Sequence, residues 1–566
     1  MASRFWTKSY DEGLKDLDPT VWEVSFAQAI RRTFEEVPDK MGLSFLGVPL
    51  TFGELDRYSN IFGHMLIEKG FRKGDCIGLN LPNVPQFVIA MLGAVKVGCV
   101  ITGISPLLSE DQMLYQLKDA EAKGIVTLDA VFAARLVNIT DKLPELQLII
   151  TTSVGDFLPK VKAFLGKLIG KIPKGKVTPI EGKTVLDFMS ILKTKEYSSA
   201  LPDVSVTPDD LLFLLYTGGT TGVPKGAMLT NRNVVADMLL VHAWLNWEHG
   251  RGVALSGFPF FHIAGIFFCI NCIYLGWSQV LIPNPRDTDS ICKGIESYQP
   301  TVLVNVPSLY QMLLANPKFK TLDHSRTEYC LSAAAPFPVE SQKELESIVG
   351  EGKLLEVYGM TETSPLTTMN PSRGEKKLGS IGLPLINTDI ILVDPATGKE
   401  VPIGESGEIC VKGPQVMKGY WNKAEETKAA IDENGYMHTG DVGVFDEEGY
   451  LKIVDRTKDM IIVSGYKVFS SKLEDTLVQH PAINMVATIG IPNPERPGSE
   501  FVKAYIALSP DYAYDGDEEA LKKEIIAWAK TKCSPYEIPK FIEFREELPL
   551  TLVGKVNKRI LRQETK

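Results

Sequence analysis

Short apolar runs and segments with helical spacing of apolar residues alternate through most of this chain. The first pattern is typical of buried strands and the second of amphipathic helices. Residues 51–70 illustrate the helical pattern, because Thr51 and Glu54 form a capping box at the start and Gly70 ends the helix. One face of this helix is apolar and consists of Leu55, Tyr58, Phe62 and Met65. The alternation predicts an α/β fold with mostly parallel strands, among them 301–306 and 353–358.

The pattern changes after Gly404, where the glycine-bounded runs 407–412 and 450–455 predict short antiparallel strands. The densely charged run 455–459 follows a strand that we expect to end at Val454. Because charges at this density are poor core material, the run predicts an exposed and flexible domain boundary.

Beyond the boundary, strands at 485–491 and 501–508 are expected to precede a helix at 518–533. The apolar face of this helix consists of Leu521, Ile525, Trp528 and Ala529. We therefore expect a large multi-layer N-terminal domain of β-sheets and helices, a hinge, and a small mobile α+β C-terminal domain. Their predicted bounds are 1–455 for the N-terminal domain, 456–459 for the hinge and 460–566 for the C-terminal domain.

The composition fits a large globular enzyme. With 566 residues, 44% of them hydrophobic and 23% charged, the chain is too long for one core, so at least two domains are expected. A net charge of −10 at pH 7 argues against nucleic acid as a partner. The eight cysteines are scattered and the first eight residues lack a secretory leader, so we expect reduced thiols and a cytoplasmic location. Cys269 and Cys272 form the only close pair, and the apolar run 266–275 around them favours a core position over a zinc site.

No segment reaches the roughly 20 uninterrupted apolar residues of a membrane span. Residues 157–177 instead predict a basic amphipathic helix, for which two interpretations remain open: peripheral contact with an anionic membrane, or packing on the chain's own domain. Pro159, Gly166 and Gly170 weaken a free-standing helix there. The apolar residues at helical spacing are Phe157, Val161, Phe164, Leu165, Leu168, Ile169 and Ile172. The surrounding basic residues are Lys160, Lys162, Lys167, Lys171, Lys174 and Lys176.

Residues 216–226 combine glycines, hydroxyl groups and one lysine in a tight loop after the apolar run 211–215, which predicts a buried strand. Glycines can turn successive N–H groups toward an anion, while hydroxyls and a lysine add donors and charge. The Walker motif does not fit, because Val223 and Pro224 separate Gly222 from Lys225. The loop therefore predicts a polyphosphate site of another kind, with an ordinary surface loop as the alternative. The candidate ligands are Thr217, Gly218, Gly219, Thr220, Thr221, Gly222 and Lys225.

Four further motifs follow this loop along the chain. They are 358–363 with Glu362, 434–441 with Asp441, the hinge with Arg456, and Gly554-Lys555. In this order they resemble the core motifs of the adenylate-forming superfamily of acyl-CoA synthetases, aryl-CoA ligases, luciferases and peptide-synthetase adenylation domains. Within it, the sequence is most similar to bacterial long-chain fatty acid-CoA ligases. That similarity lies in the Thr-Gly-Gly form of the first loop and in the segments 379–384, 411–417 and 434–458.

The resemblance implies that ATP converts a carboxylic acid into an acyl-adenylate, which CoA then intercepts. It implies Mg²⁺ held by Glu362 and Thr220, and ATP and CoA as co-substrates. The implied catalytic residues are Lys555, which bridges the acid and the α-phosphate, together with Glu362, Thr361 and His262. The residues implied to bind ATP or AMP are the loop residues named above and Ala334, Ala335, Tyr358, Gly359, Asp441 and Arg456. A pivot at Lys458 is implied to present Ser464, Gly465 and Tyr466 to the CoA channel.

His262 lies in 258–265, which resembles the acyl-pocket motif of the family, although a lone histidine in an apolar run is also typical of the core. The apolar residues after it suit an acyl chain. Ile266 stands where some long-chain ligases carry a gating tryptophan, so a gated tunnel is not predicted. Val463 and the segment 470–472 also depart from the residues common in relatives, and both departures bear on the second half-reaction.

The function we expect is ligation of a medium- or long-chain fatty acid to CoA, with release of AMP and pyrophosphate. An aryl- or branched-acid CoA ligase is the alternative with the same chemistry. A catalytically silent binding protein is the alternative of another class, and the presence of Glu362 and Lys555 argues against it. The expected partners are the small molecules fatty acid, ATP and CoA, and a homodimer is a further hypothesis.

Overall fold

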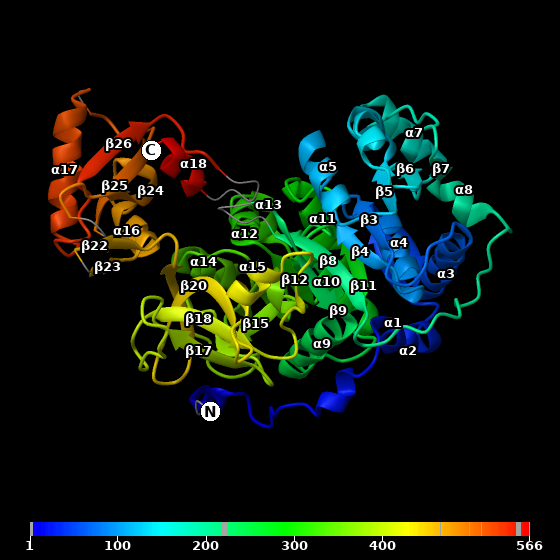
Figure 1. The fold of residues 1–566 in the computed structure, drawn as a ribbon, viewed down its shortest axis with the longest axis horizontal. Coiled ribbons are helices and arrows are strands. Elements are labelled where there is room, and N and C mark those ends of the chain that lie inside the picture. Colours follow the sequence, from blue (N-terminus) through cyan, green and yellow to red (C-terminus); the bar gives the residue numbers. More distant parts are fainter. Residues whose placement is uncertain are drawn as a thin grey trace.

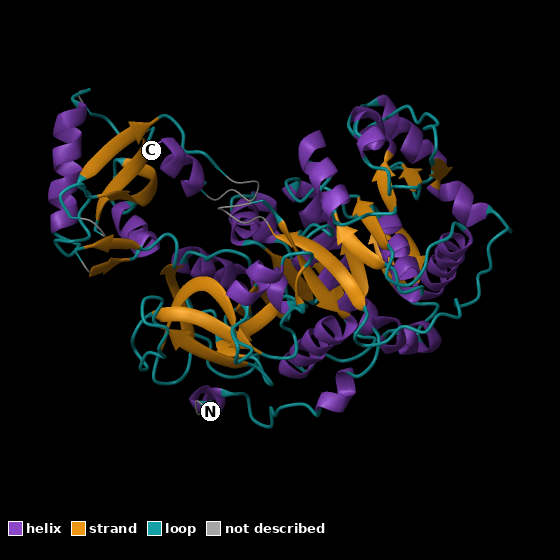
Figure 2. Ribbon diagram, viewed as in Figure 1, coloured by secondary structure: helices purple, strands orange, loops and turns teal. Residues whose placement is uncertain are grey.

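The computed structural model describes residues 4–217, 223–464, 466–496, 499–510, 512–514, 516–550 and 556–564. Two large mixed sheets and a smaller antiparallel sheet form the body of the molecule, and a C-terminal unit projects at one end of its long axis (Figure 1). Helices cover the large sheets, as Figure 2 shows in purple. The predicted α/β class, with a large N-terminal and a small C-terminal domain, is confirmed.

The first large sheet has eight strands in the order β19-β9-β8-β4-β3-β5-β6-β7. Five of its seven strand pairings are parallel, and only β8–β9 and β9–β19 are antiparallel. The buried run 211–215 forms most of β8, as predicted. The strand bounds are β3 (Cys76–Asn80), β4 (Val100–Gly103), β5 (Gly124–Leu128), β6 (Leu148–Thr152), β7 (Thr184–Asp187), β8 (Leu211–Thr217), β9 (Lys225–Thr230) and β19 (Gly419–Tyr420).

The second large sheet has nine strands in the order β16-β15-β14-β13-β12-β10-β11-β1-β2. Its five central pairings are parallel, and the antiparallel pairings lie at the two edges. The strands expected at 301–306 and 353–358 are β12 and β14. The bounds are β1 (Met41–Phe45), β2 (Val48–Thr51), β10 (Val253–Ser256), β11 (Ser278–Leu281), β12 (Val302–Asn305), β13 (Tyr329–Ser332), β14 (Leu354–Gly359), β15 (Leu366–Met369) and β16 (Leu383–Pro384).

The core of the large domain contains helices that are apolar on more than one side. Every residue of α4 is buried, and α4, α9 and α10 contribute to the same hydrophobic cluster as strands of both large sheets. Cys269 and Cys272 are buried in α10, which confirms the core interpretation of this pair. The bounds of the longer helices are α3 (Phe52–Glu68), α4 (Pro85–Lys96), α5 (Glu110–Asp119), α9 (Asn231–Leu245), α10 (Ile263–Tyr274), α11 (Thr288–Tyr298), α12 (Pro307–Leu314) and α14 (Val339–Val349).

Shorter helices connect these elements. The predicted capping box is present at the start of α3, where the Thr51 side chain accepts from the Glu54 N–H and the Glu54 carboxylate accepts from the Thr51 N–H. The short helices are α1 (Phe26–Ala29), α2 (Arg31–Glu36), α6 (Asp129–Ala134), α7 (Lys160–Leu168), α8 (Phe188–Lys193), α13 (Pro317–Thr321) and α15 (Ala424–Ala430). The 3-10 helices are η1 (Phe5–Ser9), η2 (Pro19–Trp22), η3 (Leu136–Asn138), η4 (Thr140–Lys142) and η5 (Thr361–Thr363).

The antiparallel strands expected after Gly404 belong to a four-stranded sheet in the order β17-β18-β20-β21. The C-terminal unit holds a two-stranded and a three-stranded sheet with three helices, and Leu521, Ile525 and Ala529 of its longest helix are buried as predicted. The first sheet consists of β17 (Asp389–Val393), β18 (Gly407–Lys412), β20 (Met437–Phe445) and β21 (Leu451–Arg456). The C-terminal elements are β22 (Ile461–Val463), β23 (Tyr466–Val468), α16 (Ser470–Leu477), β24 (Ile483–Pro492), β25 (Glu500–Leu508), α17 (Glu518–Lys530), β26 (Phe541–Arg545) and α18 (Lys558–Glu564).

The charged run 455–459 differs from the expectation at its first residues. Strand β21 continues to Arg456 rather than ending at Val454, and Asp455 is only 1% exposed. The Asp455 carboxylate accepts hydrogen bonds from the Ser470 N–H and from the Ser471 hydroxyl at 3.1 Å, at the N-terminus of α16. A helix N-terminus with unpaired N–H groups stabilises a buried carboxylate, so the expectation of an exposed Asp455 is wrong.

The basic amphipathic segment is also shorter than predicted. Helix α7 covers only Lys160–Leu168, because Pro159 precedes it and Gly170 has a left-handed φ of 72° just after it. Ile172 is buried and Phe157 partly buried, whereas the other five apolar residues of the predicted stripe are exposed. No helix among the residues that the structure describes is long and apolar enough to span a bilayer.

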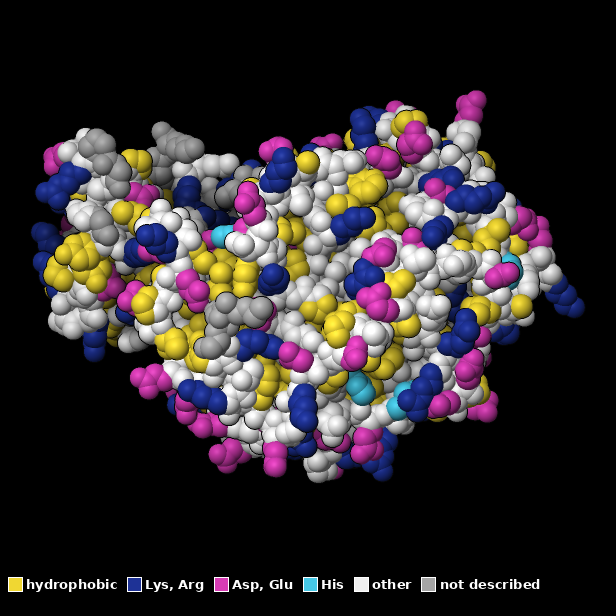
Figure 3. All heavy atoms as spheres, turned by 60° about the horizontal axis from the view of Figure 1, so that its bottom comes forward, with side chains coloured by type: hydrophobic (Ala, Val, Ile, Leu, Met, Phe, Trp, Pro, Cys, Tyr) yellow, Lys and Arg dark blue, Asp and Glu magenta, His cyan; other side chains and the backbone are white. Residues whose placement is uncertain are grey.

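The outer surface of the body carries both signs of charge. On the face drawn in Figure 3, basic and acidic side chains are interspersed and hydrophobic side chains reach the surface in separate groups. Among the described residues, an ion pair joins the C-terminal unit to the four-stranded sheet, between Lys467 Nζ and Asp394 Oδ2 at 2.8 Å. Both side chains are partly buried.

Candidate active site

The two ends of the glycine-threonine loop are held by β8 and β9. Thr217 and Lys225 are paired across these antiparallel strands, and the Thr217 hydroxyl donates to the Lys225 carbonyl at 3.4 Å. The Lys225 ammonium lies 4.3 Å from the centre of the Tyr420 ring. The remaining predicted loop ligands, Gly218, Gly219, Thr220, Thr221 and Gly222, lie outside the described residues, as do Lys555 and Gly465.

Glu362 lies in η5 with a carboxylate that is almost fully buried. It is 7% exposed, and its Oε1 accepts a hydrogen bond from the Tyr420 hydroxyl at 2.8 Å. Its carbonyl accepts from the Met417 N–H at 2.8 Å, which fixes η5 against the segment before β19. Burial raises the pKa of Glu362, while the Tyr420 hydroxyl and the Lys225 charge oppose that rise.

Close backbone contacts in the turn after β14 determine the position of Glu362. A Cβ atom on Gly359 would lie 1.8 Å from the Pro365 carbonyl oxygen, so only glycine fits here. The same oxygen accepts from the Met360 N–H at 2.9 Å and from the Thr363 hydroxyl at 2.6 Å. Thr361 is buried within this tight turn. The turn therefore holds Glu362 in one place relative to the end of β14.

Asp441 is a second buried carboxylate near the first. It is 6% exposed, its Oδ2 accepts from the Tyr358 hydroxyl at 2.7 Å, and Arg456 Nε lies 3.0 Å from its Oδ1. Asp441 and Arg456 are directly opposite each other in the β20–β21 pairing. The negative charge of Asp441 contributes to the raised pKa of Glu362, so the two carboxylates are close enough to interact.

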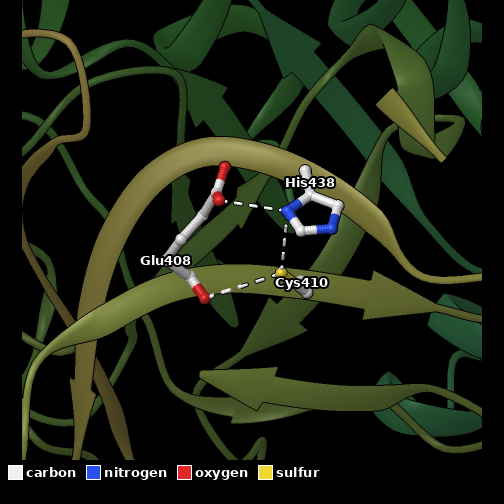
Figure 4. Close-up of side chains that lie close together, drawn as sticks. All are labelled: Glu408, Cys410 and His438. Carbon is white, nitrogen blue, oxygen red and sulfur yellow. Dashed lines mark hydrogen bonds and ion pairs between the residues drawn. The ribbon is translucent and has the colours of Figure 1, made fainter. Parts of the chain in front are cut away.

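Three side chains of β18 and β20, Glu408, Cys410 and His438, form a hydrogen-bonded group, which is drawn in Figure 4. His438 Nδ1 lies 3.0 Å from Glu408 Oε2 and 3.4 Å from Cys410 Sγ, and the ligand atoms of the three residues lie within 4.8 Å of one another. A metal could in principle use such a set. Burial, with the Glu408 charge beside it, raises the pKa of the Cys410 thiol, which donates a hydrogen bond to the Glu408 carbonyl at 3.7 Å.

The group also fixes the turn before Asp441. The other oxygen of Glu408, Oε1, accepts from the Gly440 N–H at 3.0 Å, and Gly440 has a left-handed φ of 73°. Because Gly440 directly precedes Asp441, the Glu408 carboxylate determines where the Asp441 side chain begins. Glu408 and His438 therefore position the second carboxylate.

Ala334 and Ala335 lie in the loop after β13, next to the end of β14. These strands are parallel, so their carboxyl ends and the loops that follow lie at the same edge of the sheet. Ala334 has an unusual left-handed φ of 72°, which turns the chain at this edge. The structure thus brings the alanine loop, Tyr358 and the Glu362 turn to one edge.

His262 caps α10. Its Nδ1 accepts a hydrogen bond from the Ala264 N–H at 3.3 Å, so the neutral ring carries its proton on Nε2. The side chain is accessible to solvent although protein surrounds it, and this enclosure lowers its pKa. Because its side chain is exposed, His262 is not a core residue, and the strand end at Gly103 lies against the neighbouring Phe261 backbone.

The residues predicted for the hinge and CoA channel lie in or beside the C-terminal unit. Tyr466 is 58% exposed and stacks on Tyr536 with ring centres 4.6 Å apart. Ser464 has a φ of 51°, and its N–H donates to the Ser499 hydroxyl at 2.8 Å. Lys458 is exposed. In the described part of the chain, no hydrogen bond or ion pair joins Ser464 or Tyr466 to Glu362 or Asp441.

Sequence reasoning missed three side chains that support the site. Tyr420 follows the noted segment 411–417 by three residues, and no local pattern links it to Glu362. Asp237 is a buried carboxylate of α9 whose Oδ2 accepts from the Leu366 N–H at 2.9 Å, and burial raises its pKa. A lone acidic residue on an apolar helix face was the available signal for Asp237. Glu408, which accepts from the Gly440 N–H next to Asp441, is the third of these supporting side chains.

The comparisons with known proteins cover nearly the whole chain. Residues 30–421 match the family described as AMP-binding enzyme, and 472–555 match the AMP-binding enzyme C-terminal domain. A long-chain-fatty-acid–CoA ligase of Bacillus subtilis is 39% identical over 93% of this chain and 92% of its own length. One of Escherichia coli O6:H1 is 35% identical over 100% of this chain and 98% of its own length.

A solved structure supports the same assignment. The anthranilate CoA ligase AuaEII, in complex with anthranoyl-AMP, is similar with a TM-score of 0.82 and 26% identity, over 97% of this chain and 99% of that chain. The resemblance derived from the ordered motifs is thereby confirmed. The family-model matches, the similar relatives and the fold together place this chain in the family of AMP-binding, adenylate-forming enzymes.

Proposed function

We propose that this chain joins a medium- or long-chain fatty acid to coenzyme A through an acyl-adenylate, at the expense of ATP. The observation that carries the adenylation step is the pair of buried carboxylates, Glu362 and Asp441, each fixed by a tyrosine hydroxyl at one site. The fatty acid as substrate is supported by the extent of the likeness to the Bacillus subtilis ligase.

Asp441 is suited to bind the ribose of the nucleotide. An ionised carboxylate offers about four acceptor positions. Tyr358 and Arg456 occupy two of them, so two remain for the two hydroxyl groups of a ribose. The adenine would then stack on the Tyr358 ring, with Gly359 and the loop that contains Ala334 and Ala335 beside it.

Glu362 is suited to Mg²⁺, because hard cations prefer oxygen ligands and only Oε1 is engaged by Tyr420. With Thr220 it would hold the ion, whose charge offsets that of the phosphates when ATP is bound. Thr361 lies beside this carboxylate and would face the α-phosphate. The loop from Thr217 to Lys225, with Gly218, Gly219, Thr221 and Gly222, would hold the β- and γ-phosphates.

In the first step, a carboxylate oxygen of the acid attacks the α-phosphorus, and the bond to the bridging oxygen breaks to release pyrophosphate. Lys555 would neutralise the charge that develops between the acid and the α-phosphate. In the second step, the CoA sulfur attacks the acyl carbon, AMP leaves, and the thiol proton passes to solvent. A rotation at Lys458 would replace Lys555 by Ser464, Gly465 and Tyr466 between the two steps.

The acyl chain would lie along α10. His262 is exposed at the start of this helix, and the buried residues that follow it are apolar. Because the similar AuaEII structure contains anthranoyl-AMP, an aryl acid is the second candidate substrate.

The test is a pyrophosphate-release assay with short, medium, long and aromatic acids, with and without CoA. We expect the highest kcat/KM with medium or long aliphatic acids and thioester only when CoA is present. A preference for benzoate-type acids would favour the aryl-CoA ligase. No release with any acid would favour a silent binding protein.

A further inference from the structure

An uncovered apolar stripe lies on the outer side of α7. Five side chains in nine residues are 51–72% exposed. We refer to these residues as the α7 stripe, and they are Val161, Phe164, Leu165, Leu168 and Ile169. Isolated exposed apolar residues are ordinary, but a contiguous group of this kind marks an interaction surface.

The stripe faces away from the protein because the opposite side of α7 is the one that packs. A Cβ atom on Gly166 would lie 2.7 Å from the Ile172 side chain, and Gly155 lies against both Ile172 and Ala163. At about 100° per residue, Ala163 and Gly166 lie opposite the stripe, which spans an arc of roughly 140°. The helix is therefore seated on small residues and turns its large ones outward.

The charge around the stripe has one sign. Residues 157–177 contain six lysines and no acidic residue, in a chain with a net charge of −10. In the described part of the chain, none of these lysines forms an ion pair within 4.0 Å. Two of them have an acidic residue in their vicinity, Lys167 near Asp129 and Lys171 near Asp287. Lys162 Nζ donates to the Leu46 carbonyl at 2.5 Å. The other three lysines, Lys160, Lys174 and Lys176, are exposed.

We propose that the α7 stripe and its lysines dock this protein on the surface of an anionic lipid bilayer. Apolar side chains enter the region between headgroups and acyl chains, and lysines at the flanks of the helix remain with the anionic headgroups. A second copy of the chain is a poor occupant, because a twofold contact would place two patches of six lysines against each other.

The position of α7 suits this role. Figure 1 shows α7 and the C-terminal unit at opposite ends of the long axis of the molecule. A bilayer bound at α7 would therefore leave the C-terminal unit free to move. Docking is independent of the identity of the acid, because neither the stripe nor the lysines belong to the proposed active site.

The test measures co-sedimentation of the full chain with vesicles of phosphatidylcholine, alone or with phosphatidylglycerol. We expect binding only when phosphatidylglycerol is present. The double variant with Phe164→Ser and Leu168→Ser should bind at least about tenfold more weakly. Its matched control carries Leu201→Ser and Ile403→Ser, two exposed apolar residues elsewhere, and should bind like the original chain.

A second pair of variants tests the charge. Lys160→Gln with Lys174→Gln should weaken binding about thirtyfold, since each lysine near an anionic surface contributes on the order of 1 kcal/mol and about 1.4 kcal/mol corresponds to a factor of ten. Lys195→Gln with Lys399→Gln, which removes the same charge elsewhere, should not. The adenylation rate with a short soluble acid is measured in parallel and should be unchanged in all four variants.

Equal vesicle binding by the stripe variant and its control would overturn the proposal, as would no binding to anionic vesicles. A stripe-dependent dimer in sedimentation velocity, without vesicle binding, would assign the surface to self-association instead. A loss of adenylation in all proteins would contradict the proposed enzyme function but would leave the vesicle result interpretable.

Discussion

Replacing Tyr420 with phenylalanine removes one hydroxyl group from the proposed magnesium site and leaves the ring in place. In the structure this hydroxyl donates to Glu362 Oε1 at 2.8 Å, and Glu362 is only 7% exposed. The Tyr420 hydroxyl favours the ionised carboxylate and opposes the rise in pKa that burial causes. The variant therefore raises the pKa of Glu362 further.

The expected loss follows from the type of bond. A hydrogen bond to a charged group contributes about 1.5–3 kcal/mol, and about 1.4 kcal/mol corresponds to a factor of ten. Adenylation by Tyr420→Phe should therefore fall about tenfold to a hundredfold in the acidic range. The loss should shrink as pH rises, because Glu362 is ionised again above its new pKa.

The assay is ATP–pyrophosphate exchange as a function of pH and of Mg²⁺ concentration. We expect the acidic limb of the rate profile to move to higher pH and the Mg²⁺ requirement to increase. Tyr514→Phe, at an exposed tyrosine, serves as the matched control. A rate that falls by the same factor at every pH, with an unchanged Mg²⁺ requirement, would refute the reasoning and leave Tyr420 a structural role.

Three further predictions concern other parts of the molecule. Burial raises the pKa of Glu356 from 4.5 to about 7, so ionisation of this carboxyl lowers the stability of the fold as pH rises through that window. In thermal melts, Glu356→Gln should therefore stabilise the fold by about 3 kcal/mol above about pH 7 and by little near pH 4.5. An equal gain at both pH values would contradict this. Gly359→Ala places a Cβ against the Pro365 carbonyl and should lower both the melting temperature and the exchange rate, the latter more than about tenfold, whereas unchanged exchange would show that the turn can relax. Lys555→Ala should abolish pyrophosphate exchange yet leave thioester formation from supplied acyl-adenylate largely intact, and equal loss of both would remove the role proposed for this lysine.

The sequence predicted those features that depend on neighbours along the chain. The capping box of Thr51 and Glu54, the buried strand at 211–215 and the helix at 518–533 follow from local spacing, and all three are present. Helix caps and apolar periodicity involve residues within a few positions of each other, so they can be read without the fold. The ordered motifs, taken together, also identified the family.

Contacts between distant segments were decided only by the tertiary structure. Tyr420 and Glu362 are 58 residues apart, and their hydrogen bond exists because β19 and η5 are packed against the same strand, β9. Asp455 was expected to be exposed, but α16 covers it and donates to its carboxylate. The charge of a residue does not reveal whether a helix N-terminus will meet it.

The segment 157–177 shows the same division within one helix. Its apolar spacing and its lysines are fixed by the sequence, and both the membrane and the domain-packing interpretations agree with them. Which side of the helix is covered depends on what the rest of the chain places against it. The structure seats α7 on Ala163 and Gly166 and leaves the large side chains uncovered, because Ile172 fills the space beneath the helix.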